Sequence, residues 1–186
     1  MARKKEVENL DELVGKELVA PTLDEEDPYI DEAMPIKVEV FRYVKDAKIP
    51  VKADVGSSGF DLYAVLDTPI TITQGDVALI PTGLNLCIPM GYEAQIRPRS
   101  GLALNKGLTV LNTPGTVDSS YCGEGEKFEV KVIIINHSKS AQTISPGERI
   151  AQMVFCKLPD VELVEVEDTY DWAPVTRTGG FGSTGV

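Results

Sequence analysis

The sequence predicts an all-β domain, a sandwich or jelly roll with one short helix. Short runs rich in β-branched and aromatic residues recur from residue 36 onward, and turn-forming sequences divide them. Little helical periodicity lies between the runs, and a long succession of short strands is typical of sandwiches and jelly rolls. The predicted strands are Ile36–Val44, Asp61–Val65, Ile70–Ile72, Val77–Pro81, Leu84–Ile88, Glu93–Arg97, Leu108–Leu111, Glu129–Asn136 and Ile150–Lys157.

The segments between these runs contain glycine, proline and short polar residues, which supply the backbone angles that a chain reversal needs. One short helix is expected over Leu102–Lys106. After Pro159, valine and glutamate alternate, which predicts a last edge strand over Val161–Val166, followed by an extended arm. The predicted turns are Gly56–Gly59, Gln74–Asp76, Pro89–Gly91, Thr113–Gly115 and Ser145–Gly147.

Composition limits the class of protein. A chain of 186 residues with 42% hydrophobic content is long enough for one domain with a proper core. The net charge of −11 argues against a nucleic acid or an anionic membrane as the main partner. Much of this charge is local, because residues 1–35 carry eleven acidic against four basic residues.

The chain is divided into an acidic extension (1–35), a β domain (36–166) and a C-terminal arm or lid (167–186). Residues 6–19 alternate acidic with aliphatic residues, which is compatible with one amphipathic helix, and Pro21 would end it. The extension is therefore expected to be partly helical. It either contacts a protein partner or is a solvated, dispensable extension.

Cysteine usage and the N-terminus indicate the compartment. Cys87, Cys122 and Cys156 are widely spaced and form no CxxC pair, which fits reduced thiols and predicts neither a zinc site nor a disulfide framework. Acidic residues follow the basic start where a signal peptide would carry an apolar run, and no stretch is long enough to span a bilayer. We expect a soluble, cytoplasmic protein.

The last ten residues, from Arg177 to Val186, combine four glycines, serine and threonine hydroxyls, one guanidinium and one aromatic ring. The simplest interpretation is a frayed glycine-rich tail. Its groups also suit a nucleotide lid: Arg177 can hold phosphate oxygens in a fork, Phe181 offers a flat face to a base, and glycine amides can approach an anion closely.

Four further segments have related chemistry. Residues 53–64 form a glycine-flanked turn that presents Asp61 at the start of a strand, and residues 96–103 place two arginines and a serine before a helix-like start. Such a helix start beside arginine and serine suits an anion. Residues 115–123 carry an acid and, three residues later, an aromatic, in a predicted hairpin. The fourth segment, residues 146–155, contains Arg149 and Gln152.

In this order and spacing, the five segments resemble the five motifs of the homotrimeric dUTP diphosphatase (dUTPase) family, over roughly residues 36–186. The resemblance implies a distorted jelly-roll subunit, three of which share three active sites. It also implies hydrolysis of dUTP to dUMP and pyrophosphate with Mg2+, which lowers dUTP and supplies the precursor of thymidylate.

The resemblance also implies roles for individual residues. Asp118 would orient and deprotonate the attacking water, Tyr121 would stack under the deoxyribose where a ribose 2′-hydroxyl would clash, and Asp61 would hold the water shell of the metal. Uracil would be bound by Asn112 and by hairpin groups that include Gly115 and Val117. The phosphate contacts would be Arg99, Ser100, Gly101 and Gln152, and the lid from a neighbouring subunit would contribute Arg177, Phe181, Gly182 and Ser183.

The residues themselves leave alternatives open. Asp61 and Asp118 could be turn-forming aspartates, and Tyr121 could be a core aromatic of the hairpin. Arg97 is a weaker candidate than Arg99 for substrate contact, and Arg149 is expected in a structural ion pair. The only histidine, His137, lies in a polar turn and is given no catalytic role, and Cys122 is expected to be a bystander thiol.

One departure from the family pattern lies close to the expected site. Glu124–Phe128 lengthens the connection between Gly123 and the next strand, which implies a bulge or a longer loop. The family carries a glutamate in this region, and the longer connection leaves open whether Glu124 or Glu129 corresponds to it.

Two alternative functions are considered, a dCTP deaminase and a regulatory dUTP-binding module. A dCTP deaminase on the same fold requires a different arginine-serine motif from the Arg99-Ser100-Gly101 found here. A regulatory module would bind dUTP and signal through the acidic extension. Retention of both Asp118 and the complete tail favours turnover of dUTP.

Overall fold

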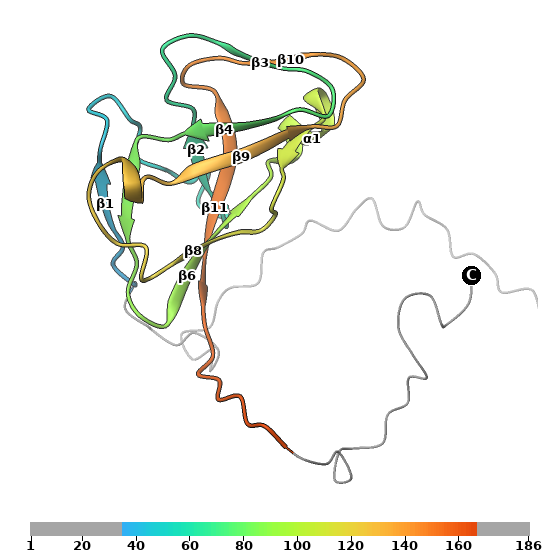
Figure 1. Cartoon of the computed structure of the whole chain (residues 1–186). Coiled ribbons are helices and arrows are strands. Elements are labelled where there is room, and N and C mark those ends of the chain that lie inside the picture. Colours follow the sequence, from blue (N-terminus) through green and yellow to red (C-terminus); the bar gives the residue numbers. More distant parts are fainter. Residues whose placement is uncertain (1–34, 167–186) are drawn as a thin grey trace, which may run out of the picture. The chain divides into compact units, whose positions relative to one another are not determined.

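The computed structural model describes residues 35–166, and the expectations for the acidic extension and the lid lie outside these residues (Figure 1). These residues form an all-β jelly roll with one short α-helix and one 3-10 turn, η2. The elements are β1 (Glu39–Arg42), β2 (Phe60–Tyr63), β3 (Ile70–Ile72), β4 (Val77–Pro81), β5 (Leu84–Cys87), β6 (Tyr92–Arg97), α1 (Ser100–Lys106), β7 (Leu108–Val110), β8 (Gly115–Asp118), η2 (Glu126–Phe128), β9 (Lys131–Asn136), β10 (Gln142–Ile144) and β11 (Arg149–Lys157).

The strands pair antiparallel in four sheets. The largest has the order β2-β11-β6-β8, the next β4-β9-β7, and two strand pairs, β1-β5 and β10-β3, complete the fold. Buried side chains from the two larger sheets join one hydrophobic cluster, in which Leu62, Ile80, Ile134 and Ile150 are almost fully buried. Burial of such side chains is the main source of stability for a domain of this size.

The side chains of β9 alternate between buried and half-buried positions, which shows which face of the strand lies against the core. Val132, Ile134 and Asn136 are buried, whereas Lys131, Ile133 and Ile135 are only half-buried. Because successive side chains of a strand point to opposite faces, the first set faces the core and the second faces outward. On the neighbouring strand β4, Val77 and Leu79 lie on the same outer face and are exposed.

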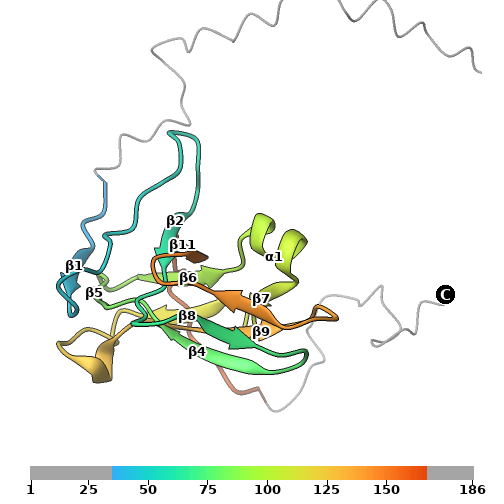
Figure 2. The same ribbon diagram turned by 90° about the horizontal axis from the view of Figure 1, so that it is seen from above.

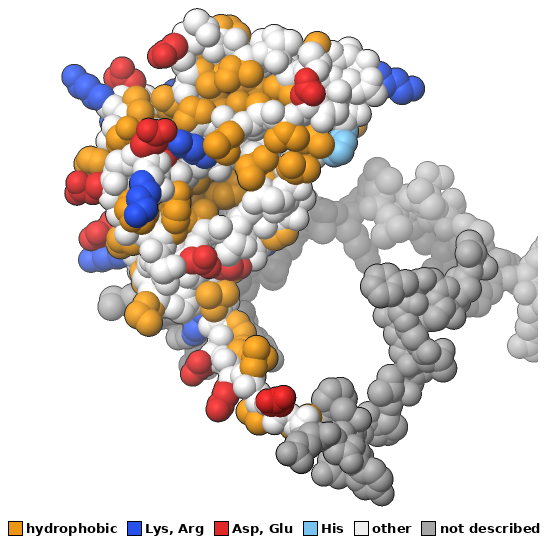
Figure 3. Space-filling model, in the orientation of Figure 1, with side chains coloured by type: hydrophobic (Ala, Val, Ile, Leu, Met, Phe, Trp, Pro, Cys, Tyr) orange, Lys and Arg blue, Asp and Glu red, His pale blue; other side chains and the backbone are white. Residues whose placement is uncertain are grey.

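Hydrophobic side chains therefore gather on the outer face of β4 and β9, as Figure 3 shows. Leu79 is 56% exposed and Val77 is 50% exposed. A solvated sheet face is normally polar, and a contiguous exposed apolar patch marks a site of association. We refer to Val77, Leu79, Leu111, Ile133 and Ile135 as the apolar face.

The helix α1 lies beside β7 (Figure 2). It ends at Gly107, whose φ of 62° is left-handed and whose amide donates to the carbonyl of Ala103 at 2.9 Å. A Cβ at this position would also lie 2.8 Å from Ser138 Cβ, so both the backbone angle and the packing require glycine. Within the described part of the chain, no helix combines the length and hydrophobicity of a membrane span.

Nine of the ten predicted strands and the predicted helix are present, with small differences at their ends. Two strands were not predicted, β8 and the polar β10. The prediction of an edge strand over Val161–Val166 is wrong, because residues 158–166 are exposed and pair with no strand of the described chain. The predicted hairpin around residues 115–123 is also wrong, since β8 pairs with β6 and a turn follows it.

The absence of a disulfide was also predicted, and this is corrected by the structure. Cys87 at the end of β5 and Cys122 are joined, with an S–S distance of 2.11 Å, and only Cys156 is a free thiol. The bond links β5 to the loop that follows β8. Cys122 is therefore a structural cross-link rather than a bystander thiol.

Candidate functional site

A buried carboxylate and two arginines form the first part of the site. Asp61 of β2 is buried, and its Oδ1 accepts from Arg99 Nε at 2.8 Å while its Oδ2 accepts from Arg149 Nη1 at 3.1 Å. Arg99 Nη1 also approaches the carbonyl of Arg149 at 3.4 Å. The ion pair expected for Arg149 is thus present. The expectation of a merely turn-forming role for Asp61 does not fit a buried residue within a strand.

The strand register brings these residues together from distant parts of the chain. In β11, Gln152 lies opposite Asp61 of β2 on one side and opposite Arg97 of β6 on the other. The register of β11 against β2 shifts between Arg149 and Ala151, which is a β-bulge. Because the bulge inserts one residue, it turns Arg149 to the same face as Gln152, where it reaches Asp61.

Gln152 is held in place by its neighbours. Its Nε2 donates to the carbonyl of Pro98 at 2.8 Å. A Cβ at Gly59 would lie 3.0 Å from Gln152 Cβ, so a side chain at position 59 would displace Gln152. The amide of Gln152 is therefore fixed next to the segment Pro98–Gly101.

The next residues along the chain begin α1. Arg99 is its N-cap, and Ser100 and Gly101 form its first turn with exposed side chains or backbone. Arg97 points elsewhere, because its guanidinium donates to Gln95 Oε1 from both Nε and Nη2, at 3.0 and 2.6 Å. The structure thus groups Asp61, Arg99, Ser100, Gly101, Arg149 and Gln152, which we call the arginine cluster.

A second part of the site lies at the end of β8. Asp118 is exposed and Tyr121 is 36% exposed, and both line one cleft of about 370 Å³. The amide of Tyr121 donates to the carbonyl of Asp118 at 3.0 Å, which closes a tight turn between them. Leu79 and Ile133 of the apolar face line the same cleft, as do Lys127 and Lys131. These two lysines were not among the site residues predicted from the sequence.

The residues expected to bind a pyrimidine lie at the start of β8. Gly115 and Val117 are buried in the strand, whereas Asn112 is exposed in the turn before it. A Cβ at Gly115 would lie 3.2 Å from Asn112 Nδ2, so the absence of a side chain allows this close approach. Because Gly115 pairs with Ile96 of β6, these groups border the strand that leads to Arg99.

Within one chain, the arginine cluster and Asp118 are separated along the sheet. Asp118 lies opposite Glu93 of β6, whereas Arg97 of the same strand lies opposite Gln152. Glu93 and Arg97 are four residues apart along β6, which corresponds to about 13 Å. The structure therefore brings the predicted residues together in two groups rather than in one site.

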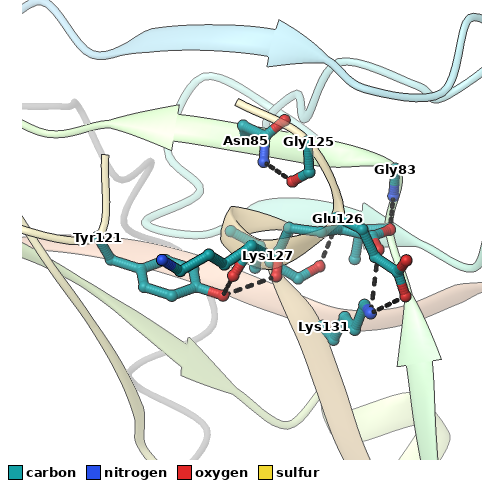
Figure 4. A network of polar contacts seen from close by, with 10 residues as sticks. Gly83, Asn85, Tyr121, Gly125, Glu126, Lys127 and Lys131 are labelled. Carbon is teal, nitrogen blue, oxygen red and sulfur yellow. Dashed lines mark hydrogen bonds and ion pairs between the residues drawn. The ribbon is translucent and has the colours of Figure 1, made fainter. Parts of the chain in front are cut away.

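The two glutamates that the sequence left open, Glu124 and Glu129, differ in burial. Glu129 is buried, accepts from the amide of Gly83 at 2.7 Å, and lies 3.5 Å from Lys131 Nζ, whereas Glu124 is exposed. Lys131 also pairs with Glu126 at 3.2 Å, and this hydrogen bond is the main reason why the pKa of Lys131 is raised above its ordinary value. Figure 4 shows this polar network beside Tyr121.

Comparison with known proteins identifies related sequences. A family model described as dUTPase matches residues 45–185. A deoxyuridine 5'-triphosphate nucleotidohydrolase of Caldanaerobacter subterraneus subsp. tengcongensis is 48% identical over 151 residues, which cover 81% of this chain and 97% of the relative. A protein of the same name from Caulobacter vibrioides is 50% identical over 143 residues, 76% of this chain and 88% of the relative.

Solved structures are similar in fold. A variant of the dUTPase of Staphylococcus bacteriophage 80alpha, determined with dUpNHpp, superposes with a TM-score of 0.65 at 23% identity, covering 81% of this chain and 99% of that one. A dUTPase variant of phage phi11 of S. aureus, described with a structural Mg(II) ion, gives a TM-score of 0.60 at 21% identity, covering 71% and 97%. Both share the jelly-roll fold with this chain.

Proposed function

This chain belongs to the dUTPase family and hydrolyses dUTP to dUMP and pyrophosphate, and we propose that Asp118 activates the attacking water in that reaction. The observation that carries this assignment is the shared cleft of Asp118 and Tyr121. An exposed carboxylate at a strand end, beside an aromatic ring, can accept a proton from a water held near a bound nucleotide. General-base assistance of this kind contributes roughly 10²–10⁴-fold to a rate.

The phosphates are proposed to bind the arginine cluster. A triphosphate needs cationic partners and hydrogen-bond donors, which Arg99, Ser100, Gly101 and Gln152 supply from adjacent positions. Asp61 supports this arrangement because its two oxygens hold Arg99 and Arg149 in place before a ligand arrives. The guanidinium of Arg99 retains further N–H groups that do not contact Asp61.

Uracil is proposed to lie against the start of β8. Asn112 would hydrogen-bond the base, with backbone groups near Gly115 and Val117 completing its edge. A backbone that fits closely around the pyrimidine excludes a 5-methyl group by steric contact. Arg177, Phe181, Gly182 and Ser183 are proposed to close over the nucleotide. They lie outside the described residues, although the family match extends to residue 185.

Mg2+ is proposed to arrive as part of the substrate. Among residues 35–166, no three His, Cys, Asp or Glu side chains gather closely enough to hold a metal ion. Both oxygens of Asp61 already accept from guanidinium groups. The side chains of residues 35–166 therefore do not fit a metal ion ligated by protein alone. They fit Mg2+ bound mainly by phosphate oxygens and water, with Asp61 accepting a hydrogen bond from one of those waters. The ion would supply charge neutralisation for the triphosphate.

A homotrimer with shared active sites is proposed on two observations. The apolar face is exposed on a single chain, and burying it against another copy would remove that surface from water. Leu79 and Ile133 of this face also line the Asp118 cleft. A second copy seated there would border the cleft and could bring its own arginine cluster to the Asp118 of the first.

We further propose a cytoplasmic enzyme whose core is residues 36–166, followed by the arm 167–186, with the extension 1–35 free to bind a protein partner. Nucleoside triphosphates are cytoplasmic metabolites, which supports this placement. The Cys87–Cys122 bond is unusual there. Thiol labelling of the protein in rapidly quenched cells would show which oxidation state it holds.

The experiment that tests the function is a substrate panel. Release of pyrophosphate is measured from dUTP, dCTP, dTTP and UTP with the full-length chain, and dUTP alone should be turned over efficiently. Release of ammonia from dCTP would instead identify a deaminase. Tight binding of dUTP without any pyrophosphate would identify a regulatory module.

A further inference from the structure

The loop after β8 contacts the ring of Tyr121 on its polar and apolar sides. The Tyr121 hydroxyl donates to two carbonyl oxygens of this loop, those of Lys127 at 3.0 Å and Glu129 at 3.2 Å (Figure 4). Phe128 packs edge-on against the Tyr121 ring, with 5.8 Å between the ring centroids and an interplanar angle of 64°. The orientation of Tyr121 is therefore defined by residues that follow it in the same loop.

Strand β5 anchors this loop at two points. Asn85, which is 2% exposed, donates from Nδ2 to the carbonyl of Gly125 at 2.9 Å. Cys87 is bonded to Cys122, the residue directly after Tyr121. Asn85 and Cys87 are two residues apart in a strand and so project from the same face. The loop is thus fixed to a buried strand rather than only to itself.

Close packing removes the remaining freedom of Phe128. A Cβ at Gly123 would lie 2.4 Å from Phe128 Cδ2, so the backbone of Gly123 passes directly against the ring. Phe128 is held between this backbone and Tyr121. A side chain at position 123 would displace Phe128 and, through it, Tyr121.

We propose that residues 122–129 position Tyr121 and thereby set how strongly the enzyme rejects ribonucleotides. This inference rests on the proposed contact of Tyr121 with the deoxyribose. A pocket that excludes one added hydroxyl only by its shape discriminates by about 10²-fold, and this requires that the wall does not move. The hydroxyl tether and Phe128 supply that rigidity. Phe128 acts through Tyr121 and is a positioning residue.

The test compares kcat/KM for dUTP with kcat/KM for UTP. Tyr121→Phe keeps the ring but removes the tether, and Phe128→Leu removes the edge-on contact. Each should lower the dUTP/UTP ratio about tenfold, mainly by lowering the KM for UTP, and for Phe128→Leu the kcat for dUTP should fall less than about threefold. Phe128→Tyr, which retains an aromatic ring, should keep the wild-type ratio. Glu124→Ala is the matched control, because Glu124 is exposed in the same loop.

Tyr121→Ala separates failure of this inference from failure of the proposed site. If Tyr121→Ala leaves the ratio unchanged, Tyr121 does not contact the sugar and its proposed role is wrong. If Tyr121→Ala lowers the ratio but Tyr121→Phe and Phe128→Leu do not, the positioning role of the loop is overturned. Thermal unfolding of each variant is measured alongside. Should Phe128→Leu fail to fold, Tyr121→Phe, which removes a single oxygen atom, decides the question.

Discussion

Arg149 Nη1 lies 3.1 Å from Asp61 Oδ2, although 88 residues separate the two in sequence. The bulge between Arg149 and Ala151 makes this contact possible, because regular alternation would place Arg149 and Gln152 on opposite faces of β11. Buried Asp61 thereby neutralises part of the charge of two guanidiniums. Arg99, the second of them, is held in place by Asp61, so the proposed phosphate contact would not require the ligand to order this side chain.

Asp118→Asn should abolish hydrolysis and leave nucleotide binding largely intact. An amide cannot accept the proton of the attacking water, so kcat should fall by roughly 10²–10⁴-fold. Pyrophosphate release measures turnover, and calorimetry with a non-hydrolysable dUTP analogue measures binding. Asp160→Asn is the control, since Asp160 is exposed in the segment after β11. Wild-type turnover by the Asp118 variant would falsify the catalytic assignment.

Shared sites predict that two inactive variants restore each other. Asp118→Asn and Arg99→Ala chains are each expected to be inactive, but random mixed trimers should carry about a quarter of wild-type sites if the two residues come from different chains. The variants are mixed, unfolded and refolded together, and then assayed. Sedimentation gives the oligomeric state. Activity no greater than the sum of the separate variants would place both residues in a site of one chain.

The disulfide predicts a redox-dependent stability. Cys87→Ser opens a cross-link between residues 35 apart in sequence, and it should lower the free energy of unfolding by about 2–4 kcal/mol under oxidising conditions. With a dithiol reductant present, wild type and variant should unfold at the same denaturant concentration. Cys156→Ser, which removes the free thiol, is the control. Equal stability of wild type and Cys87→Ser without reductant would contradict a bond in solution.

Removal of the chain from Arg177 onward should leave a folded oligomer that has lost most of its activity. The deleted segment carries the ring and the guanidinium proposed to cover the nucleotide, and its loss should depress turnover far more than melting temperature. Phe181→Ala should be milder, since stacking on one base is worth about 1–3 kcal/mol. Turnover is measured beside thermal unfolding. Equal activity of truncated and full-length proteins would show that the tail is not a lid.

Deletion of residues 1–35 should leave oligomer formation and dUTP hydrolysis nearly unchanged. The residues assigned to the site all follow residue 36, and the excess of acidic residues in the extension is expected to repel a triphosphate. Sedimentation and kcat/KM for dUTP compare the truncated and full-length chains. A large loss of activity would mean that the extension packs on the site.

Local pattern was sufficient where each strand has a clear run of β-forming residues. β3 and β4 have the predicted bounds, and β9 lies within its predicted range. The strand predictions were wrong where strand formation depends on pairing with another segment of the chain. Val161–Val166 has a strand pattern but no partner in the described chain, whereas the polar β10 is a strand because it pairs with β3, about 70 residues earlier in the sequence. Strand formation depends on a neighbour as well as on composition.

By itself, the sequence determined the all-β class, the family and the residue types of the site, because these depend on local periodicity and on motifs that are contiguous in the chain. Only the tertiary structure decided which residues meet. The Cys87–Cys122 bond, the bulge that turns Arg149 toward Asp61, and the tether of Tyr121 all join segments by strand register and loop packing. Such contacts follow from the three-dimensional path of the chain, which one-dimensional spacing does not specify.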